Sequence, residues 1–531
     1  MSAATPPLMR IGAIVRKDLR LIWPLAAGSA VLQGLLGLLQ HRSSPFDLGG
    51  PRAALAAIVT LALIVSMALV IVIVVQQEPL AGTNQDWVVR PIRRRDLLLA
   101  KLFLVALFIH GPILAVQIVQ GYSEGFRIGQ ILSAALLSNL EIALLFTLPV
   151  MAIAALTRTV GEAFVGALAV LVGLVLVFLG ISAAHFVFTG NGKLGEPVAG
   201  SGVQWVWRSL SHLWLLAVTV TVVAWQYFRR STLRARALFI GGLFLFFLTA
   251  HLPWPPAFAV QEWLGPQAAA AQVRLEAAPG QSVRIAQVEP TGAAGRRPAK
   301  GWVRLMLPLR VSGVPAGSRL YVDQAVVRLS GEGGAVFRGL GQHSELKPSA
   351  SGSPEWLEQG LLLPESTYRR LMRGPVTART QYSLTVLSAK PLGVLPVPGE
   401  ARVAQLGRCA DRIGPDAGTL QVACMTVGTQ PPCIEIRLLP ISGATQSVMH
   451  CDPDYAPAAL RFSADPIARF QVKLHVGSDV AAARGDRIQF ITYEARSHFS
   501  RTVVIAALGL PELPHARAST QGAAPHDPAP H

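Results

Sequence analysis

Long apolar runs in the first half of the chain constrain its fold more than any other feature. Six of them have about 18 or more residues, the length a helix needs to cross a bilayer; they are 21–39, 54–76, 102–119, 131–156, 163–188 and 210–228. A seventh, 237–252, would cover only about 24 Å as a helix, so a re-entrant or interfacial segment is the alternative. The sequence therefore predicts an α-helical membrane domain of six or seven transmembrane helices over 21–252.

Composition agrees with a membrane protein. Of 531 residues, 51% are hydrophobic and 15% are charged, whereas soluble domains carry about 25% charged residues. This deficit argues against a disordered chain. The formal net charge is +17, and the basic residues of the first half are concentrated in loops beside the apolar runs, which is typical of insertion topology. We therefore expect the lipid bilayer as a partner and no nucleic acid.

The basic residues also predict the orientation. With the N-terminus in the cytoplasm, fourteen Lys and Arg residues flank the runs on the cytoplasmic side and five lie on the other side. Basic residues accumulate on the cytoplasmic side of membrane proteins. Seven spans would then place everything after Pro253 outside. The excess of Arg over Lys, 40 to 7, is typical of a GC-rich bacterial source, so we expect a multi-pass protein of the bacterial inner membrane.

The second half of the chain changes to a period of two from about residue 272. In 303–311 every second residue is Val or Leu, and 469–476 alternates between apolar and polar residues. Short alternating runs separated by Gly and Pro turns are typical of antiparallel sandwiches. We expect an extracytoplasmic, β-sandwich-like domain over 253–510, as one or two sandwiches with a boundary near 392–399. A disordered tail over 511–531 would follow.

Four cysteines lie close together in this β-rich half: Cys409, Cys424, Cys433 and Cys451. They form no Cys-x-x-Cys pair of the kind that zinc ribbons use, so we expect no metal site. An even number of cysteines in a domain outside the cytoplasm favours two disulfides. Three pairings exist, and the turn sequence at 428–432 favours Cys424–Cys433 with Cys409–Cys451. In a cytoplasmic domain the same residues would be reduced thiols.

The loop between the second and third apolar runs, 78–101, carries the most informative polar sequence. A Pro and a Gly end the preceding helix, and three consecutive arginines lead into the next run. The candidate functional residues are Glu78, Asp86, Trp87, Arg90, Pro91, Arg93, Arg94 and Arg95. A loop that only sets the insertion topology needs little more than the arginines. The helix-compatible segment between Gly82 and Pro91 is more than such a loop requires, and the purely topogenic loop is the alternative.

This loop also carries a family resemblance. The string 86–101, with Trp87, the pair Arg90-Pro91 and the basic cluster after it, resembles the cytoplasmic-loop signature of ABC-2 type transporter permeases. These are the membrane subunits of ATP-binding cassette transporters. Segment 15–20 is similar to the cytoplasmic amphipathic helix that opens those permeases, expected here over 1–20. The resemblance implies that 78–101 is a coupling loop seated in a groove of a separate ABC ATPase subunit. It also implies a dimer with a second permease copy or a related chain.

Polar residues inside the apolar runs are candidates for the lining of a translocation path. An ionised Glu141 in mid-span would cost roughly 2.5–3.5 kcal/mol, so it must be protonated, paired or in contact with water. Asn139 lies beside it, and His110 in the preceding run is one conceivable partner. The alternative is a hydrogen-bonded group that packs two helices together.

Catalytic motifs are absent from the sequence. It contains no Gly-x-x-x-x-Gly-Lys-Ser/Thr string, whose amides would cradle phosphates, and no Gly-x-Ser-x-Gly or His-Glu-x-x-His motif. We expect a chain that is not an enzyme and binds no cofactor, with ATP and Mg²⁺ held by the partner ATPase. The resemblance implies the permease subunit of an ATP-driven exporter. The alternative is a non-transporting membrane anchor that displays a disulfide-braced β-domain for binding or envelope assembly.

Overall fold

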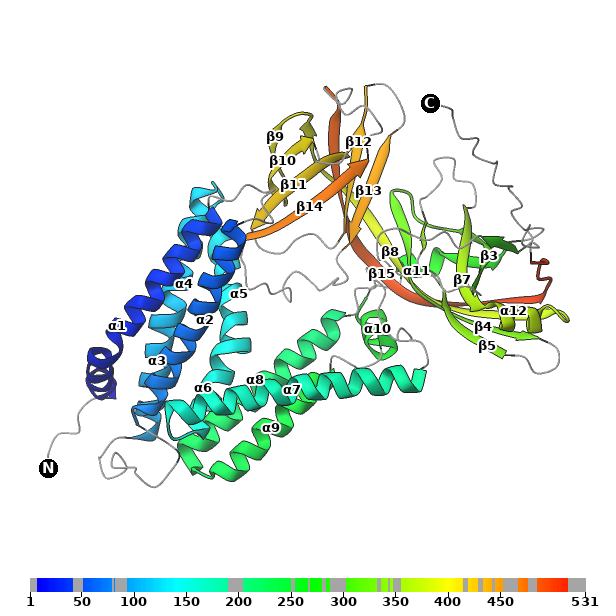
Figure 1. Ribbon diagram of the computed structural model, residues 1–531. Helices are drawn as coiled ribbons and strands as arrows, with labels where there is room; N and C mark the ends of the chain where they lie inside the picture. Colours follow the sequence, from blue (N-terminus) through cyan, green and yellow to red (C-terminus); the bar gives the residue numbers. More distant parts are fainter. Residues whose placement is uncertain are drawn as a thin grey trace, which may run out of the picture. The chain divides into compact units, whose positions relative to one another are not determined.

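The fold is seen in a computed structural model (Figure 1). It describes residues 7–41, 51–78, 81, 93–189, 204–249, 254–265, 268–278, 283–286, 302–331, 336–341, 344–346, 355–413, 419–427, 433–441, 445–451, 467–475 and 485–513. The chain divides into two compact units. The first comprises Met1–Pro266 and Leu387–Arg496, and the second comprises Gln267–Val386 and Ser497–His531.

Helices fill the first half of the chain. They are α1 (Pro7–His41), α2 (Pro51–Gln76), α3 (Arg94–Val105), the π-helix η2 (Ala106–His110), α4 (Gly111–Ser123), α5 (Ile128–Ile142), the π-helix η3 (Ala143–Thr147), α6 (Leu148–Leu156), α7 (Val160–Thr189), α8 (Gln204–Arg229), α9 (Thr232–Thr249), α10 (Trp254–Leu264) and α11 (Ala268–Gln272). Within the described residues, seven helical stretches are long and apolar enough to cross a membrane. The prediction of six or seven long apolar helices is confirmed, and the seventh apolar run overlaps the helix Thr232–Thr249.

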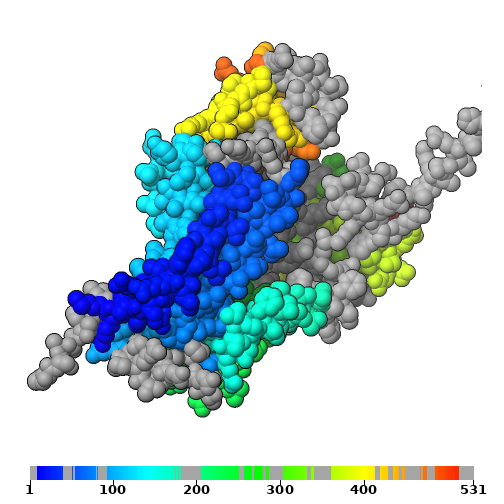
Figure 2. Space-filling model, turned by 60° about the vertical axis from the view of Figure 1, so that its left-hand side comes forward, coloured from blue at the N-terminus to red at the C-terminus, as the bar shows by residue number. Residues whose placement is uncertain are grey.

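Helix α1 differs from the predicted division at residue 20. It runs without a break from Pro7 to His41 and contains Pro24, so the expected amphipathic helix and the first span form one element. The polar segment at its start continues into the apolar one because the Arg and Lys residues there have high helix propensity. Figure 2 shows α1, in dark blue, along the surface of the helical region, and Leu21 and Val31 are among its exposed apolar side chains.

Two π-turns interrupt the third and fourth apolar stretches. η2 ends at His110, two residues before Pro112, and η3 ends at Thr147, two residues before Pro149. Proline lacks an amide hydrogen and clashes with the carbonyl four residues earlier, and a local π-turn accommodates that clash while the helix continues.

Helix α2 forms the centre of the helical core. Val70, Ile71 and Val74 are fully buried, and α2 contacts α1, α3, α6 and α7. Helices α8 and α9 approach closely at Gly242, where a Cβ would lie 2.5 Å from a methyl group of Val218. Helix α7 is far less buried than α2, because only 6% of its apolar segment Val160–Val177 is buried.

The strands of the first unit build a two-layered region. One sheet has the order β14 (Ile467–His475), β11 (Thr419–Val427), β10 (Gly407–Ile413) and β9 (Glu400–Val403). The other strands are β12 (Cys433–Leu439), β13 (Gln446–Cys451) and the parts of β8 (Val376–Pro396) and β15 (Arg487–Leu508) that belong to this unit. Apolar residues from both sets, such as Val422 and Phe490, form one core. This matches the sandwich-like packing that the alternating pattern predicts.

The second unit holds most of an 11-stranded sheet of the described residues, to which β12 and β13 of the first unit also belong. Its strands are β1 (Arg274–Ala277), β2 (Arg284–Ala286), β3 (Trp302–Ser312), β4 (Ser318–Gly331), β5 (Val336–Gly341), β6 (Ser344–Leu346), β7 (Glu355–Pro364) and the remaining parts of β8 and β15, with the short helix α12 (Glu365–Leu371). The chain passes from one unit to the other within β8 and β15, at 386/387 and 496/497, and β8 remains extended up to Pro396, within the predicted boundary region 392–399. Residues 514–531 of the predicted tail lie outside the described residues.

Candidate functional site

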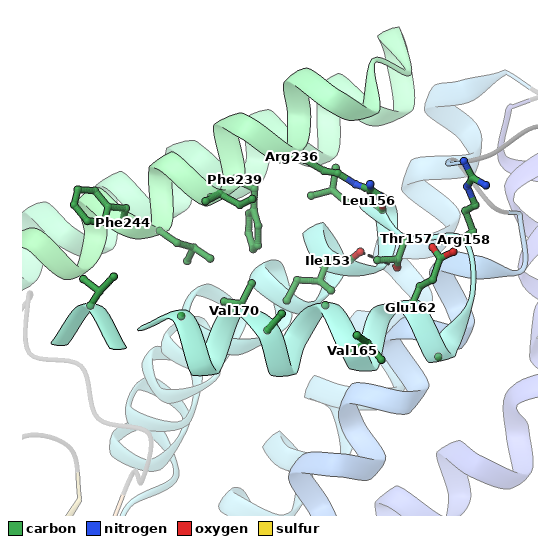
Figure 3. A pocket seen from close by; sticks show the side chains of 17 residues that line it. Ile153, Leu156, Thr157, Arg158, Glu162, Val165, Val170, Arg236, Phe239 and Phe244 are labelled. Atoms are coloured by element: carbon green, nitrogen blue, oxygen red, sulfur yellow. Dashed lines mark hydrogen bonds between the residues drawn. The ribbon is translucent and has the colours of Figure 1, made fainter. Parts of the chain in front are cut away.

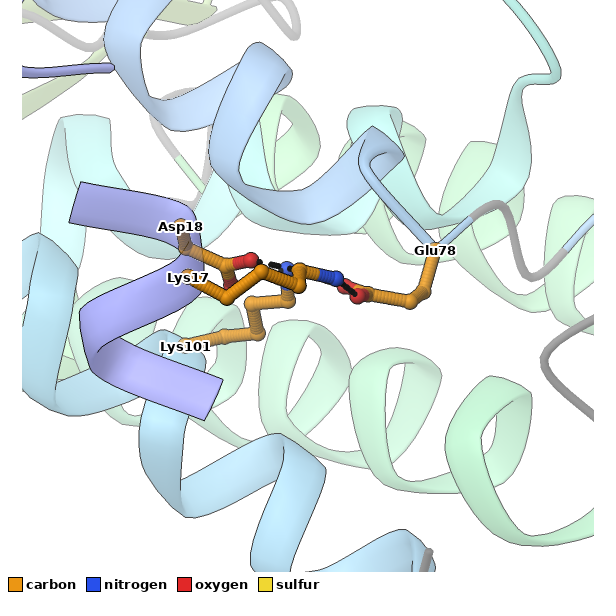
Figure 4. Close-up of polar contacts among 4 residues, drawn as sticks. All are labelled: Lys17, Asp18, Glu78 and Lys101. Carbon is orange, nitrogen blue, oxygen red and sulfur yellow. Dashed lines mark hydrogen bonds and ion pairs between the residues drawn. The ribbon is translucent and has the colours of Figure 1, made fainter. Parts of the chain in front are cut away.

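Four charged side chains converge where α2 ends and α3 begins (Figure 4). Lys17 and Asp18 come from α1, Glu78 follows the end of α2, and Lys101 lies on α3. Lys101 Nζ is 2.8 Å from Asp18 Oδ2 and also pairs with Glu78. Lys17 pairs with Glu78 and lies 3.4 Å from an Asp18 oxygen. We call these four residues the ionic cluster.

Most of the ionic cluster is removed from solvent. The side chains of Asp18 and Lys101 are 0% exposed and that of Glu78 is 5% exposed, whereas that of Lys17 is 53% exposed. Two cations and two carboxylates make the cluster neutral. Burying a charge costs several kcal/mol unless a partner compensates, so the positions of these four side chains depend on one another.

Glu78 remains ionised within the cluster. Burial acts to raise its pKa, but the neighbouring Lys101 and Lys17 outweigh burial and lower the pKa of Glu78 below its usual value. Both ends of the 78–101 loop therefore carry opposite charges that bind each other and α1.

The three consecutive arginines at the end of the loop have separate contacts. Arg93 precedes α3, and its carbonyl accepts the amide hydrogens of the first turn. Arg94 donates to the carbonyl of Phe228, near the C-terminus of α8, where helices leave carbonyls without partners. Arg95 lies 3.7 Å from Asp96, a buried carboxylate that also faces Arg10.

Four of the candidate residues of the loop lie in the segment 82–92, which is outside the described residues. They are Asp86, Trp87, Arg90 and Pro91. The pairing of Lys101 with α1 was not expected from the sequence. The available signal was a lysine between apolar residues in the string Leu-Leu-Ala-Lys-Leu-Phe-Leu, which is too deep in a helix to act only as a loop charge.

Polar side chains within the apolar helices form a second network. His110 Nδ1 lies 3.1 Å from Asn139 Oδ1, and His110 Nε2 lies 3.2 Å from Thr147 Oγ1. Asn139 in turn donates to Gln117, which donates to Ser138. His110 and Thr147 are the last residues of η2 and η3, so this network joins the two π-turns.

Glu141 has a different partner from the one considered. Its carboxylate lies 2.9 Å from a guanidinium nitrogen of Arg208 on α8. His110 bonds Asn139 and Thr147 instead, so its pairing with Glu141 is wrong. An ion pair satisfies the requirement for a buried carboxylate in mid-helix, and it links α5 to α8.

The disulfide pairing also differs from the favoured one. The structure contains Cys409–Cys424, between residues that face each other on β10 and β11 with a Cα–Cα distance of 4.0 Å. The Cys424–Cys433 prediction is wrong, because the two residues lie on strands of different sheets. The register of β12 and β13 places the backbone of Cys433 opposite that of Cys451.

A buried polar group lies in the second unit. Thr385 Oγ1 donates to Asp323 Oδ2 at 2.5 Å and lies 2.8 Å from His498 Nδ1. Burial raises the pKa of Asp323 well above its usual value and lowers the pKa of His498 to about 4. The sequence signal for this group was a lone aspartate in the apolar strand β4.

Comparison with known proteins gives no further identification. No protein-family model matches the chain, and no curated protein matches it. Within the described residues, no three His, Cys, Asp or Glu side chains are grouped as metal ligands. The assignment of function therefore depends on the helices and the ionic cluster.

Proposed function

We propose that the chain is the membrane-spanning permease subunit of an ATP-driven transporter of the ABC-2 type, working in export. A separate ATPase subunit docks on the 78–101 loop and supplies the energy of ATP hydrolysis. A second copy, or a related chain, completes the translocation path. The seven long apolar helices among the described residues and the sequence of the loop together support this proposal.

The observation that carries the proposal is the double pairing of Lys101, to Asp18 on α1 and to Glu78 at the start of the loop. A coupling loop must pass its displacement to the spans. Separating buried charges costs several kcal/mol, so the two ends of the loop and α1 respond to a push as one body. A loop that served only topology would not need these contacts.

The predicted topology places the loop in the cytoplasm, where an ATPase and ATP are present. It places the β-rich region outside, and the Cys409–Cys424 bridge supports this, because disulfides persist in oxidising compartments. His110, Asn139 and Glu141 remain candidates for the path lining. Since Glu141 pairs with Arg208, it would take part only if that ion pair opened.

Co-purification tests the proposal. The tagged full chain is isolated in mild detergent from its native membrane and assayed for an associated Walker-motif subunit and ATP hydrolysis. Trp87→Ala and Arg90→Glu in the loop are expected to abolish the association. Arg234→Glu is the matched control, because Arg234 is an exposed arginine on α9, predicted on the same side of the membrane. Membrane abundance is measured for every variant.

The disulfide favours a second candidate function, a membrane anchor that displays a braced β-region for binding or envelope assembly. In that case the correctly inserted wild-type chain purifies without an ATPase, and Arg90→Glu replaces the wild-type chain without effect in cells whose own copy is deleted. This pair of results would replace the permease proposal.

A further inference from the structure

Helices α6, α7 and α9 enclose a groove of about 890 Å³ (Figure 3). Its volume falls in the range of about 300–1,000 Å³ that is typical of small-molecule sites. Apolar side chains line most of it, including Val165 and Val170 on α7 and Phe239 and Phe244 on α9. Val165 on α7 and Ile240 on α9, which both line the groove, are more than half exposed. The groove is therefore accessible from the side of the helices, where lipid would lie.

One end of the groove is polar. Arg158, Arg236, Thr157 and Glu162 lie there, and Phe244 lies at the opposite end (Figure 3). Two guanidinium groups against one carboxylate give this end a net positive charge. Both arginines belong to the set of basic residues that predicts the cytoplasmic side of the membrane.

The polar end is held in place by the protein. Arg236 donates through Nε and Nη2 to the carbonyl of Leu156, at 3.2 and 2.8 Å, which fixes its guanidinium at the last residue of α6. Glu162 accepts the backbone amide hydrogen of Arg158 at 2.9 Å. Because one oxygen of Glu162 is bonded to the backbone, this carboxylate competes less with a ligand anion for the two arginines.

We propose that this groove binds one anionic glycerophospholipid from the cytoplasmic leaflet. Its phosphate lies at Arg158 and Arg236, because guanidinium groups bind phosphate oxygens with paired hydrogen bonds. An acyl chain follows the apolar wall of α7 and α9. The proposal depends on the helices lying in a bilayer and does not depend on transport.

Gly173 on α7 provides a direct test. It lines the groove, and a Cβ built at this position meets no atom within 4 Å, so Gly173→Leu fills the groove without displacing the fold. Gly180→Leu is the matched control, because Gly180 lies on the same helix, also has open space, and is not among the lining residues. Arg158→Gln removes one charge from the polar end while leaving its backbone contacts.

The experiment uses the full chain, delipidated in detergent and titrated with phosphatidylglycerol or with diacylglycerol, which lacks the phosphate. Bound lipid is counted by native mass spectrometry. The wild type is expected to bind one phosphatidylglycerol in preference to diacylglycerol, and Gly180→Leu is expected to match it. Gly173→Leu loses both lipids. Arg158→Gln weakens phosphatidylglycerol about tenfold or more and leaves diacylglycerol unchanged.

Three results would overturn the proposal. The first is equal binding of the two lipids by the wild type, which would show that the phosphate does not contribute to binding. The second is unchanged binding by Gly173→Leu. The third is a change of oligomeric state in Gly173→Leu, whatever its lipid count, which would assign the groove to a second copy of the chain.

Discussion

Replacing Lys101 by methionine isolates the energetic role of the ionic cluster. The change keeps most of the side-chain volume and removes the buried ammonium group, which pairs with both Asp18 and Glu78. The two carboxylates then share Lys17, whose side chain is 53% exposed. Removing one partner of a buried pair costs about 3–5 kcal/mol. That loss corresponds to a change of more than a hundredfold in the folding equilibrium.

Lys17→Met provides the comparison within the same cluster. Because Lys17 is largely solvated, its loss is expected to cost about 1 kcal/mol or less, as for surface ion pairs. The double variant Lys101→Met/Asp18→Asn removes one charge of each sign. It is expected to recover most of the stability lost in Lys101→Met, since a neutral replacement of a buried pair is often tolerated.

The assay is reversible unfolding of the full chain in mixed micelles with increasing dodecyl sulfate, followed by the helical signal in far-ultraviolet circular dichroism. The double-mutant cycle gives the coupling between Lys101 and Asp18. The energetic role of the ionic cluster is refuted if Lys101→Met lowers the free energy of unfolding no more than Lys17→Met does, or if the losses of the two single variants simply add in the double variant.

Two further predictions concern the β-rich regions. Peptide mapping without reduction is expected to recover the bridges Cys409–Cys424 and Cys433–Cys451, and recovery of a free thiol or another pairing would contradict the second bridge. Asp323→Asn is expected to lose up to about 3 kcal/mol of stability as the pH falls from 6.5 to about 4, because the unfolded chain protonates His498 while the folded chain does not. In the wild type, Asp323 acts in the opposite direction, since its raised pKa makes stability fall as the pH rises above 3.8. Urea unfolding across this pH window should show the loss in Asp323→Asn and not in Asp323→Asn/His498→Gln.

The helical half of the fold was largely predictable because length and hydropathy define a span locally. The seventh span shows the limit of this approach. Its apolar run begins at Ala237, but α9 begins at Thr232, because nothing in the first turn breaks the helix and Arg236 finds a partner in the carbonyl of Leu156. A hydropathy window excludes such arginines, although a paired or interfacial arginine is compatible with a helix.

The β-rich half was predictable as alternating strands but not as a pairing scheme. Cys424 is separated from Cys433 by a turn-like sequence, which suggested a hairpin. Strand β11 instead pairs with β10 and β14, and β12 pairs with β13 and β15. Register is fixed by which faces are buried across the whole sheet, and that information is not local.

Polar contacts in the helical region also explain why its site could be located only in part from the sequence. Apolar surfaces discriminate poorly between helix neighbours in lipid, so interhelical polar pairs specify which helices meet. Here the ionic cluster joins α1 to α3, the His110 network joins the two π-turns, and Glu141–Arg208 joins α5 to α8. Each polar residue was visible in the sequence, but the contacts Lys101–Asp18, His110–Thr147 and Glu141–Arg208 span 83, 37 and 67 positions. The same residue therefore fits a path lining or a packing contact until its partner is known, and for Glu141 the partner is an arginine that already neutralises it.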